Sequence, residues 1–198
     1  MQALRQLTAR GLPLRRSDVD TDQIIPSDWL KRIERTGFGA GLFAEWREDP
    51  TFVLNDERFK GAKFLVAGPN FGTGSSREHA VWALEDYGFI AVISARFGDI
   101  FRNNCTKVGV LPITLDESDV EAIQDAIEKD PSTTISLDVE TREVVCEAAG
   151  VRASFPLDDF TQHRFLEGLD DIGLTLRHES DITKFEQDRP SWMPSTRV

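Results

Sequence analysis

Short apolar runs separated by glycine-rich breaks give the clearest structural signal in the middle of this chain. Residues 63–67 read Lys-Phe-Leu-Val-Ala, which is typical of a buried strand, and Gly68-Pro69 ends the run. Residues 76–86 carry apolar side chains at helical spacing, with Gly88 as the stop signal. Residues 89–93 are again continuously apolar. A strand, loop, helix and strand in this order predict a βαβ unit with parallel strands.

The rest of the pattern predicts further strands and helices around this unit. Residues up to about 60 are rich in turns and aromatic side chains. Beyond the βαβ unit we expect a strand at 108–114, a helix at 118–129, a hairpin of 133–139 with 143–147, a strand at 151–155, and helices at 158–169 and 180–188. Ser180 is the expected N-cap of the last helix, and residues 189–194 are expected to be extended. Together these elements predict an α/β fold with a mixed sheet flanked by helices.

Composition narrows the class of protein. The chain has 198 residues and 40% hydrophobic content, which fits one compact domain with a sizeable core. No apolar run approaches the ~18 residues that a membrane crossing needs, and the start does not resemble a secretory signal. We therefore expect a soluble cytoplasmic protein. The net charge of -11 argues against nucleic acid as a partner, and it means that an anionic substrate needs a local cluster of positive groups.

The cysteines and histidines predict no metal site in this chain. Cys105 and Cys146 are far apart in the sequence, and two thiols are fewer than an iron–sulfur cluster usually needs. The three histidines, His79, His163 and His178, are also scattered. We interpret both cysteines as buried small hydrophobic residues.

The glycine-rich segment 72–80, Gly-Thr-Gly-Ser-Ser-Arg-Glu-His-Ala, carries the most informative chemistry. Its glycines allow a tight turn after a strand, and a helix that starts here directs backbone N–H groups and its positive dipole end at the loop. Ser75, Ser76 and Arg77 lie at that point, and an arginine can bind a carboxylate through two parallel hydrogen bonds. The segment therefore predicts a site for a small carboxylate or phosphate. It lacks the lysine of a Walker loop and the third glycine of a dinucleotide fingerprint.

Other interpretations of this segment also stay open. Ser75 and Glu78 have the spacing of a capping box, in which Ser75 caps the helix, and a cap can coexist with an anion site. His79 fits a structural role in the helix. A nucleophilic pair of Ser76 and His79 is a further possibility, although the surrounding sequence lacks the nucleophile-elbow motif of serine hydrolases.

Several motifs in order along the chain resemble the aconitase swivel-domain family, and most closely the small subunits of bacterial isopropylmalate isomerases (3-isopropylmalate dehydratases). The segment 71–80 resembles the family signature. The other matching segments are 18–26 (Asp-Val-Asp-Thr-Asp-Gln-Ile-Ile-Pro), 30–38, 97–101, 103–107, 109–112 and 169–178. The resemblance covers nearly the whole chain and implies a single mixed-sheet β/β/α swivel domain over residues 1–198, with an extended C-terminal tail from about residue 179.

The resemblance also implies a reaction and a partner. Enzymes of this family dehydrate a hydroxy acid and rehydrate the alkene, here 2-isopropylmalate to 3-isopropylmalate in leucine biosynthesis. It implies Ser75 as the base, Asp22 as an active-site aspartate, Ser76 and Arg77 as carboxylate ligands, and a loop that selects the side group, Trp29, Leu30, Lys31 and Arg32. The [4Fe-4S] cluster is expected on a separate large subunit, in a heterodimer that acts on a small dicarboxylate. A serine base needs groups that stabilise its alkoxide, and a departing hydroxide needs a Lewis acid that this chain has no ligands to hold.

Departures from the family pattern and related enzymes leave the substrate side group open. Trp29 replaces an expected Phe or Tyr, and Val81 stands where relatives commonly have Pro. Lys31, Arg32 and Arg35 form a basic cluster that fits substrate approach, a partner contact or a solvated loop. Small subunits of homoaconitase and of citraconate or methylmalate hydratases share the scaffold and are the nearest alternatives. A non-catalytic anion-binding module and a self-sufficient serine hydrolase are the alternatives of other classes.

Overall fold

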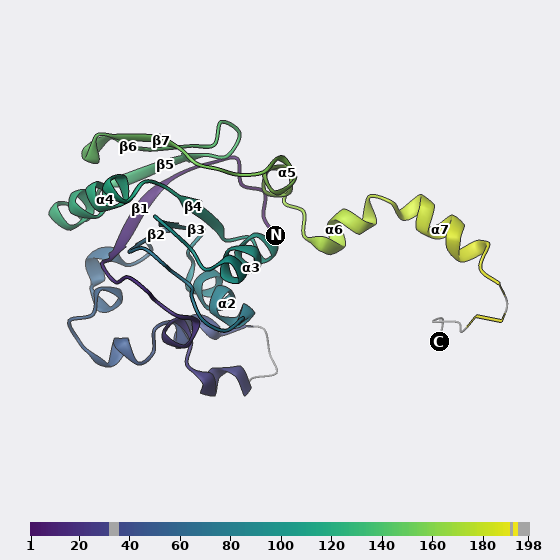
Figure 1. Cartoon of the computed structure of the whole chain (residues 1–198), viewed down its shortest axis with the longest axis horizontal. Helices are drawn as coiled ribbons and strands as arrows, with labels where there is room; N and C mark the ends of the chain where they lie inside the picture. The colour runs from purple at the N-terminus through teal and green to yellow at the C-terminus, as the bar shows by residue number, and fades with distance from the viewer. Residues whose placement is uncertain (32–35, 191, 194–198) are drawn as a thin grey trace.

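The computed structural model describes residues 1–31, 36–190 and 192–193. Seven strands of this part of the chain form one mixed sheet in the order β4-β3-β2-β1-β5-β6-β7 (Figure 1). Neighbouring strands from β4 to β1 are parallel, and those from β1 to β7 are antiparallel. The strands are β1 (Gln6–Leu14), β2 (Phe64–Ala67), β3 (Ala91–Ser94), β4 (Leu111–Thr114), β5 (Thr134–Asp138), β6 (Glu143–Cys146) and β7 (Val151–Ser154). The predicted mixed sheet, parallel βαβ unit and hairpin are confirmed.

Helices connect the parallel strands and cover the sheet. Helix α4 packs against β1, β2, β3 and β7, whereas α2 packs against α3 and a 3-10 turn at Phe38–Gly41. The helices are α1 (Thr21–Ile24), α2 (Glu78–Tyr87), α3 (Asp99–Val108), α4 (Glu117–Lys129), α5 (Asp159–Glu167), α6 (Asp171–Leu176) and α7 (Glu179–Gln187). None of them, over the described ranges, has the length and apolar character that a bilayer crossing requires.

Strand β1 was not predicted, although it is central to the sheet and pairs with both β2 and β5. Gly11 and Pro13 interrupt its apolar pattern, and both residues disfavour a strand in sequence-based reasoning. The glycine is required by packing, because a Cβ at Gly11 would lie 2.7 Å from Cδ1 of Ile127 on α4. The close approach of α4 therefore explains why this buried strand does not look like one.

Several predicted element boundaries were wrong. Residues 108–114 are not one strand: α3 ends at Val108, Gly109 adopts a φ of 112° as its C-cap, and β4 begins at Leu111. The last helix has His178 rather than Ser180 at its N-cap position, since Ser180 lies inside the first turn of α7. Residues 191 and 194, in the predicted extended tail, lie outside the described residues.

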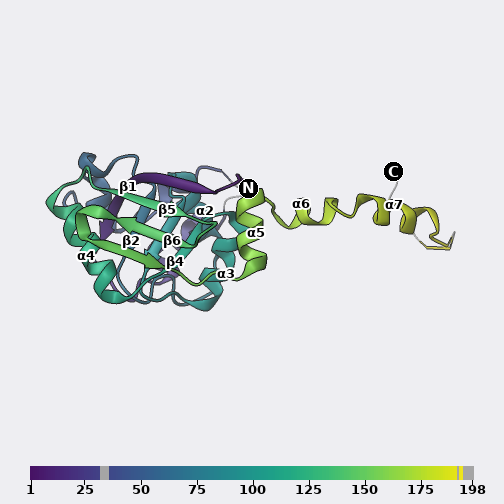
Figure 2. The same cartoon turned by 90° about the horizontal axis from the view of Figure 1, so that it is seen from above.

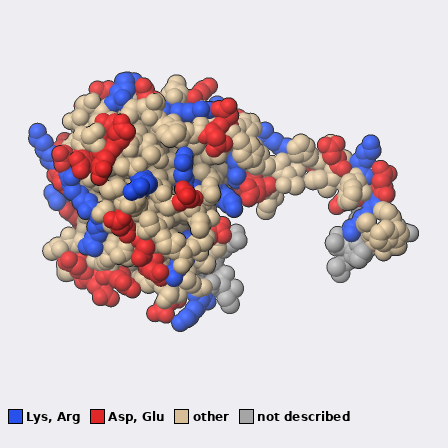
Figure 3. All heavy atoms as spheres, in the orientation of Figure 1, with Lys and Arg blue, Asp and Glu red and all other residues tan. Residues whose placement is uncertain are grey.

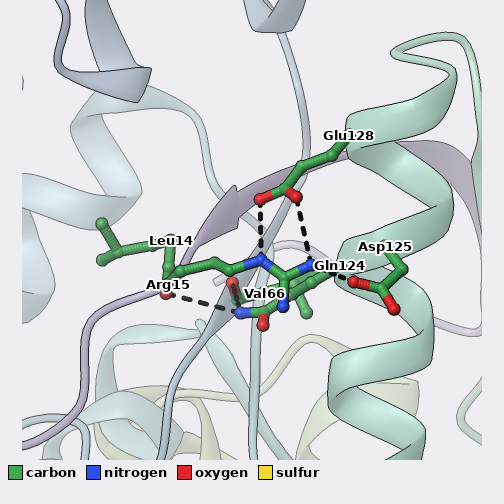
Figure 4. A network of polar contacts seen from close by, with 6 residues as sticks. All are labelled: Leu14, Arg15, Val66, Gln124, Asp125 and Glu128. Atoms are coloured by element: carbon green, nitrogen blue, oxygen red, sulfur yellow. Dashed lines mark hydrogen bonds and ion pairs between the residues drawn. The ribbon is translucent and has the colours of Figure 1, made fainter.

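A buried polar contact fastens α4 to the ends of two parallel strands. Gln124 is 3% exposed, and its Nε2 donates to the carbonyl oxygens of Val66 at 2.9 Å and Leu14 at 3.4 Å (Figure 4). Nearby on the surface, Arg15 donates to both carboxylate oxygens of Glu128, at 2.8 and 3.1 Å, and pairs with Asp125. The amide and the guanidinium hold the same helix, but only the amide is buried.

Replacing Gln124 with methionine is expected to lower the free energy of unfolding by about 1–3 kcal/mol, because the 2.9 Å hydrogen bond to the buried Val66 carbonyl is lost while the side-chain volume is nearly kept. The Leu14 carbonyl still accepts from the N–H groups of Arg16 and Gly68. The matched change Arg15→Met removes a surface ion pair and is expected to cost about 1 kcal/mol or less. Chemical denaturation of both variants measures the difference. An equal, small effect of the two substitutions would contradict the assignment of Gln124 as the main polar fastening.

Candidate active site

Three loops meet at one edge of the sheet. Strands β1, β2 and β3 are parallel, so their carboxyl ends at Leu14, Ala67 and Ser94 lie at the same edge. In open α/β sheets, ligands bind at this edge. The loop after β2, residues 68–77, contains the glycine-rich segment and is called the site loop below.

Backbone hydrogen bonds join the site loop to the loops on both sides. The N–H groups of Gly72 and Thr73 donate to the carbonyl oxygen of Val19, at 2.7 and 3.1 Å. On the other side, the Phe71 N–H donates to the carbonyl oxygen of Arg96 at 3.0 Å. The site loop is therefore held as a middle strand-like segment between segments that follow β1 and β3.

Two glycines, Gly72 and Gly98, allow this close packing. The sequence predicted that glycines of the segment 72–80, which includes Gly72, allow a tight turn here. Gly72 has a φ of +75°, and a Cβ there would lie 2.2 Å from Cγ of Phe101. A Cβ at Gly98 would lie 2.4 Å from the carbonyl oxygen of Gly72. Neither position has room for a side chain, so the course of the loop depends on glycine at both.

The loop presents Ser75, Ser76 and Arg77 immediately before helix α2. Both serines are exposed, whereas the Arg77 side chain is 18% exposed. The predicted capping box is wrong: α2 begins at Glu78 with Arg77 in the N-cap position, and no side chain caps it. The extended backbone of Arg77, with φ of -132°, ends the loop two residues later than the capping-box spacing implied. Ser75 is thus free of a capping role, and the positive end of the α2 dipole lies beside it.

The segment after β1 brings Asp22 to the same place. Asp22 forms an ion pair with Nη1 of Arg77. It lies in the short helix α1, whose start is fixed by a reciprocal capping box between Asp20 and Gln23, with hydrogen bonds of 2.8 and 3.0 Å. The structure therefore brings together three of the predicted site positions, Ser75, Arg77 and Asp22, from segments more than fifty residues apart.

Thr21 is a site-supporting residue that sequence reasoning did not single out. Its side chain is 2% exposed, and Oγ1 donates to the carbonyl oxygen of Ser75 at 2.7 Å. Its backbone N–H donates to the carbonyl oxygen of Thr73 at 3.0 Å. The sequence carries no local signal for this contact, because the hydrogen bond joins residues that lie 54 positions apart in the chain.

Comparison with known proteins identifies the family. The sequence profile of the aconitase C-terminal domain matches residues 1–118, and that of the C-terminal domain of the 3-isopropylmalate dehydratase small subunit matches residues 171–195. A curated protein named 3-isopropylmalate dehydratase small subunit from Parafrankia sp. is 65% identical to this chain, over 99% of this chain and 100% of its own length. A protein of the same name from Frankia alni is 64% identical, over 98% of this chain and 99% of its own length. The chain belongs to the 3-isopropylmalate dehydratase small-subunit family.

A solved structure from this family has the same fold. The crystal structure of 3-isopropylmalate dehydratase from Methanocaldococcus jannaschii superimposes with a TM-score of 0.67 at 25% identity, covering 90% of this chain and 98% of that one. The predicted aconitase-type fold and the resemblance to small subunits of this dehydratase are both confirmed.

The segment that the family resemblance assigns to side-group selection lies only partly within the described residues. Trp29, Leu30 and Lys31 form a 3-10 turn, Ser27–Lys31, whereas Arg32 lies outside the described residues. Trp29 and Leu30 are half-buried against the apolar core, and Lys31 is exposed with its Nζ donating to Asp28 at 3.1 Å. The Trp29 ring packs closely against Gly41, where a Cβ would lie 2.4 Å from the ring, and this contact holds the 3-10 turn in place. Their part in substrate binding remains a prediction.

His79 packs in an aromatic cluster on α2. Its ring centroid lies 5.5 Å from that of Phe38 and 4.6 Å from that of Trp82. No hydrogen bond joins His79 to Ser76 in the described part of the chain. This arrangement gives no support to a Ser76–His79 nucleophilic pair of the serine-hydrolase type.

The described residues of this family member do not fit a resident iron–sulfur cluster. No group of three or more His, Cys, Asp or Glu side chains is placed to hold a metal ion among the described residues. Both cysteines are buried, as predicted, and burial raises the pKa of the Cys105 thiol well above its usual range and also raises the pKa of Cys146. A neutral thiol is a poor ligand, because metals bind the thiolate.

Proposed function

We propose that this chain is the small subunit of 3-isopropylmalate dehydratase and acts with a large subunit in leucine biosynthesis. The pair converts 2-isopropylmalate to 3-isopropylmalate through 2-isopropylmaleate, by loss of water and its addition in the opposite sense. The observation that carries the proposal is the 65% identity, over 99% of this chain, to a protein with that name. The net charge of -11 means that an anionic substrate has to be held by a local group of positive side chains.

Ser75 is the proposed base. Its hydroxyl group, once deprotonated, takes a proton from the carbon next to the one that bears the hydroxyl group, and the bonding electrons form the double bond as hydroxide leaves. A serine alkoxide requires positive groups beside it. The support comes from the start of α2 and the guanidinium of Arg77, both within three residues of Ser75.

Ser76 and Arg77 are the proposed ligands of a substrate carboxylate. Arg77 offers a planar fork of donors, and its low exposure strengthens any charge-assisted hydrogen bond that it makes. Asp22 holds the guanidinium through the ion pair with Nη1 and so orients it before substrate arrives. We assign Asp22 this positioning role within the site.

The large subunit is proposed to carry the [4Fe-4S] cluster, which supplies the Lewis acid for the leaving hydroxyl group. The absence of a metal-ligand group from the described residues of this chain supports that division. Ser75 and Ser76 are exposed, and so is Asp22, with a side chain that is 56% exposed. Acid–base chemistry of this kind proceeds best where water is excluded, so a partner surface is needed to cover these residues. The cytoplasm is the proposed location of the complex.

The side-group pocket is proposed to involve residues 29–32, with the half-buried Trp29 and Leu30 facing the isopropyl group. An apolar side group needs apolar contacts, whereas the extra carboxylate of a homoaconitase substrate would need Lys31 or Arg32. The packing of Trp29 and Leu30 against the core supports the apolar alternative.

Anaerobic assays of the chain alone, the large subunit alone and their mixture test the proposal. We expect the absorbance of 2-isopropylmaleate to rise from 3-isopropylmalate only in the mixture. Turnover of homoaconitate, citraconate or methylmalate in place of isopropylmalate would keep the enzyme class and change the substrate. Failure of the mixture on all these acids, with a large subunit that is active with its own small subunit, would reject the proposed function.

A further inference from the structure

A C-terminal arm, residues 170–190, projects from the body of the molecule. Figures 1 and 2 show α6 and α7 extending away from α5 in two perpendicular views. The arm exposes large apolar side chains: Ile172 is 70% exposed, Leu176 58% and Phe185 67%. Soluble monomers seldom expose apolar groups that lie together, and such groups commonly mark a binding surface.

The apolar residues follow helical spacing. Ile172 and Leu176 are four residues apart in α6, and Ile182 and Phe185 are three apart in α7, so each helix presents an apolar face. The two helices have 6 and 9 residues, and isolated helices shorter than about 12 residues are marginal in water. Their helical form therefore needs a surface on which those faces pack.

The base of the arm is fixed to the body. Asp171 pairs with the buried Arg164 at 2.9 Å, and Arg177 contacts Nε2 of His163 at 2.9 Å and Glu167 at 3.4 Å. At the start of α7, by contrast, Nδ1 of His178 lies 3.7 Å from a carboxylate oxygen of Asp181, so both partners of this contact belong to the arm. The arm thus has an anchored base and a projecting end.

The position of the base connects the arm to the candidate active site. A hollow of about 380 Å³ is lined by residues of α2, among them Glu78 and Trp82, and by Asp170, Asp171 and Ile172 of the arm. Glu78 directly follows Arg77, so this hollow begins where the site loop ends. A partner that covers Ser75 and Ser76 and extends along α2 therefore reaches Ile172.

Two observations favour the large subunit over a second copy of this chain as that partner. The profile that matches residues 171–195 is the one described as the C-terminal domain of the 3-isopropylmalate dehydratase small subunit, whereas the aconitase C-terminal profile matches residues 1–118. The arm carries six acidic and three basic residues, so two copies would repel each other along it. In Figure 3, residues other than Lys, Arg, Asp and Glu form most of the visible face where the arm leaves the body.

We propose that the arm is a docking element that packs Ile172, Leu176 and Phe185 into an apolar groove of the large subunit, with basic residues at the rim of that groove. The inference rests on the proposed function, because it takes the large subunit as the partner. The arm is assigned to assembly and not to chemistry, since its base adjoins the site while its end projects away from it.

The matched substitutions Phe185→Ser in the arm and Phe160→Ser on α5 test this inference in the full-length chain. Both side chains are exposed, at 67% and 60%, so neither change removes a buried core residue. We expect Phe185→Ser to raise the Kd for the purified large subunit about 10-fold or more and Phe160→Ser to leave it within about 2-fold. At saturating large subunit, kcat of the Phe185→Ser enzyme is expected to match that of the unchanged enzyme. A double variant, Ile172→Ser with Leu176→Ser, extends the test to α6.

Each other outcome has a distinct meaning. An unchanged Kd for both arm variants overturns the docking role while leaving the proposed function intact. If sedimentation shows a dimer of the isolated chain that the arm variants dissociate, with the Kd for the large subunit unchanged, a second copy covers the arm and the inference is wrong. If the unchanged chain neither binds nor activates the large subunit, the proposed function itself fails.

Discussion

Replacing Ser75 with alanine is expected to reduce kcat of the reconstituted enzyme by about 10³-fold, because a positioned general base contributes roughly 10²–10⁴-fold. The structure separates this effect from a folding defect. The side chain of Ser75 is exposed and does not cap α2, and the hydrogen bond from Thr21 is accepted by the backbone carbonyl of Ser75, which alanine retains. The unfolding free energy is therefore expected to change by only about 0.5 kcal/mol or less.

Ser76→Ala is the matched control for that substitution. It removes a neighbouring hydroxyl group that is equally exposed, and its proposed role is to bind a carboxylate, so we expect a higher KM and a much smaller loss of kcat. Affinity for the large subunit should be the same for both variants. A Ser75→Ala enzyme with kcat within about 10-fold of the unchanged enzyme would exclude Ser75 as the base.

The predictable part of the fold is the part whose local pattern and tertiary packing agree. The segment from 63 to 93 has continuous apolar strands, a helical spacing with Ala80, Ala83 and Leu84 on the buried face, and Gly88 at a left-handed C-cap. Each signal points to the same parallel unit, and the structure confirms it.

The elements that were not predicted include a strand in which packing overrides local preference and a helix whose apolar spacing was missed. Strand β1 contains Gly11 because Ile127 leaves no room for a side chain, and helix α3 carries only two buried residues, Phe101 and Cys105. Strand β1 lacks the continuous apolar run that identifies a buried strand. Helix α3, by contrast, has Phe101, Cys105 and Val108 at helical spacing, and sequence reasoning missed this signal. Both nevertheless contribute to the site, because β1 leads to Asp22 and α3 packs its Phe101 against Gly72.

For the site, the sequence pointed to the residue types but not to their contacts. Ser75, Ser76 and Arg77 are adjacent in the chain, so local reasoning groups them. The ion pair of Arg77 with Asp22 and the hydrogen bond from Thr21 to Ser75 depend on loops that follow different strands. Only the parallel order of β1 and β2 brings these loops together.

Arg77→Lys is expected to lower kcat/KM by about 10²-fold, mainly through KM, because a hydrogen bond to a charged group contributes about 1.5–3 kcal/mol and lysine cannot reproduce the planar fork. The charge is kept, so a purely electrostatic role for Arg77 would leave kcat/KM nearly unchanged. Steady-state kinetics with 3-isopropylmalate at saturating large subunit distinguish these outcomes.

Asp22→Asn completes a double-mutant cycle that separates positioning from independent chemistry. Asp22 is 56% exposed and contacts Arg77 directly, so we expect its removal to act through the guanidinium. The double variant should then lose little more kcat/KM than Arg77→Lys alone, with a coupling energy of about 1–2 kcal/mol, within the range for residues in contact. Losses that multiply would contradict the positioning role and assign Asp22 its own contact with the substrate. The cycle decides this from four rates, because Asp22→Asn removes the ion pair and Arg77→Lys removes the guanidinium that Asp22 is proposed to position.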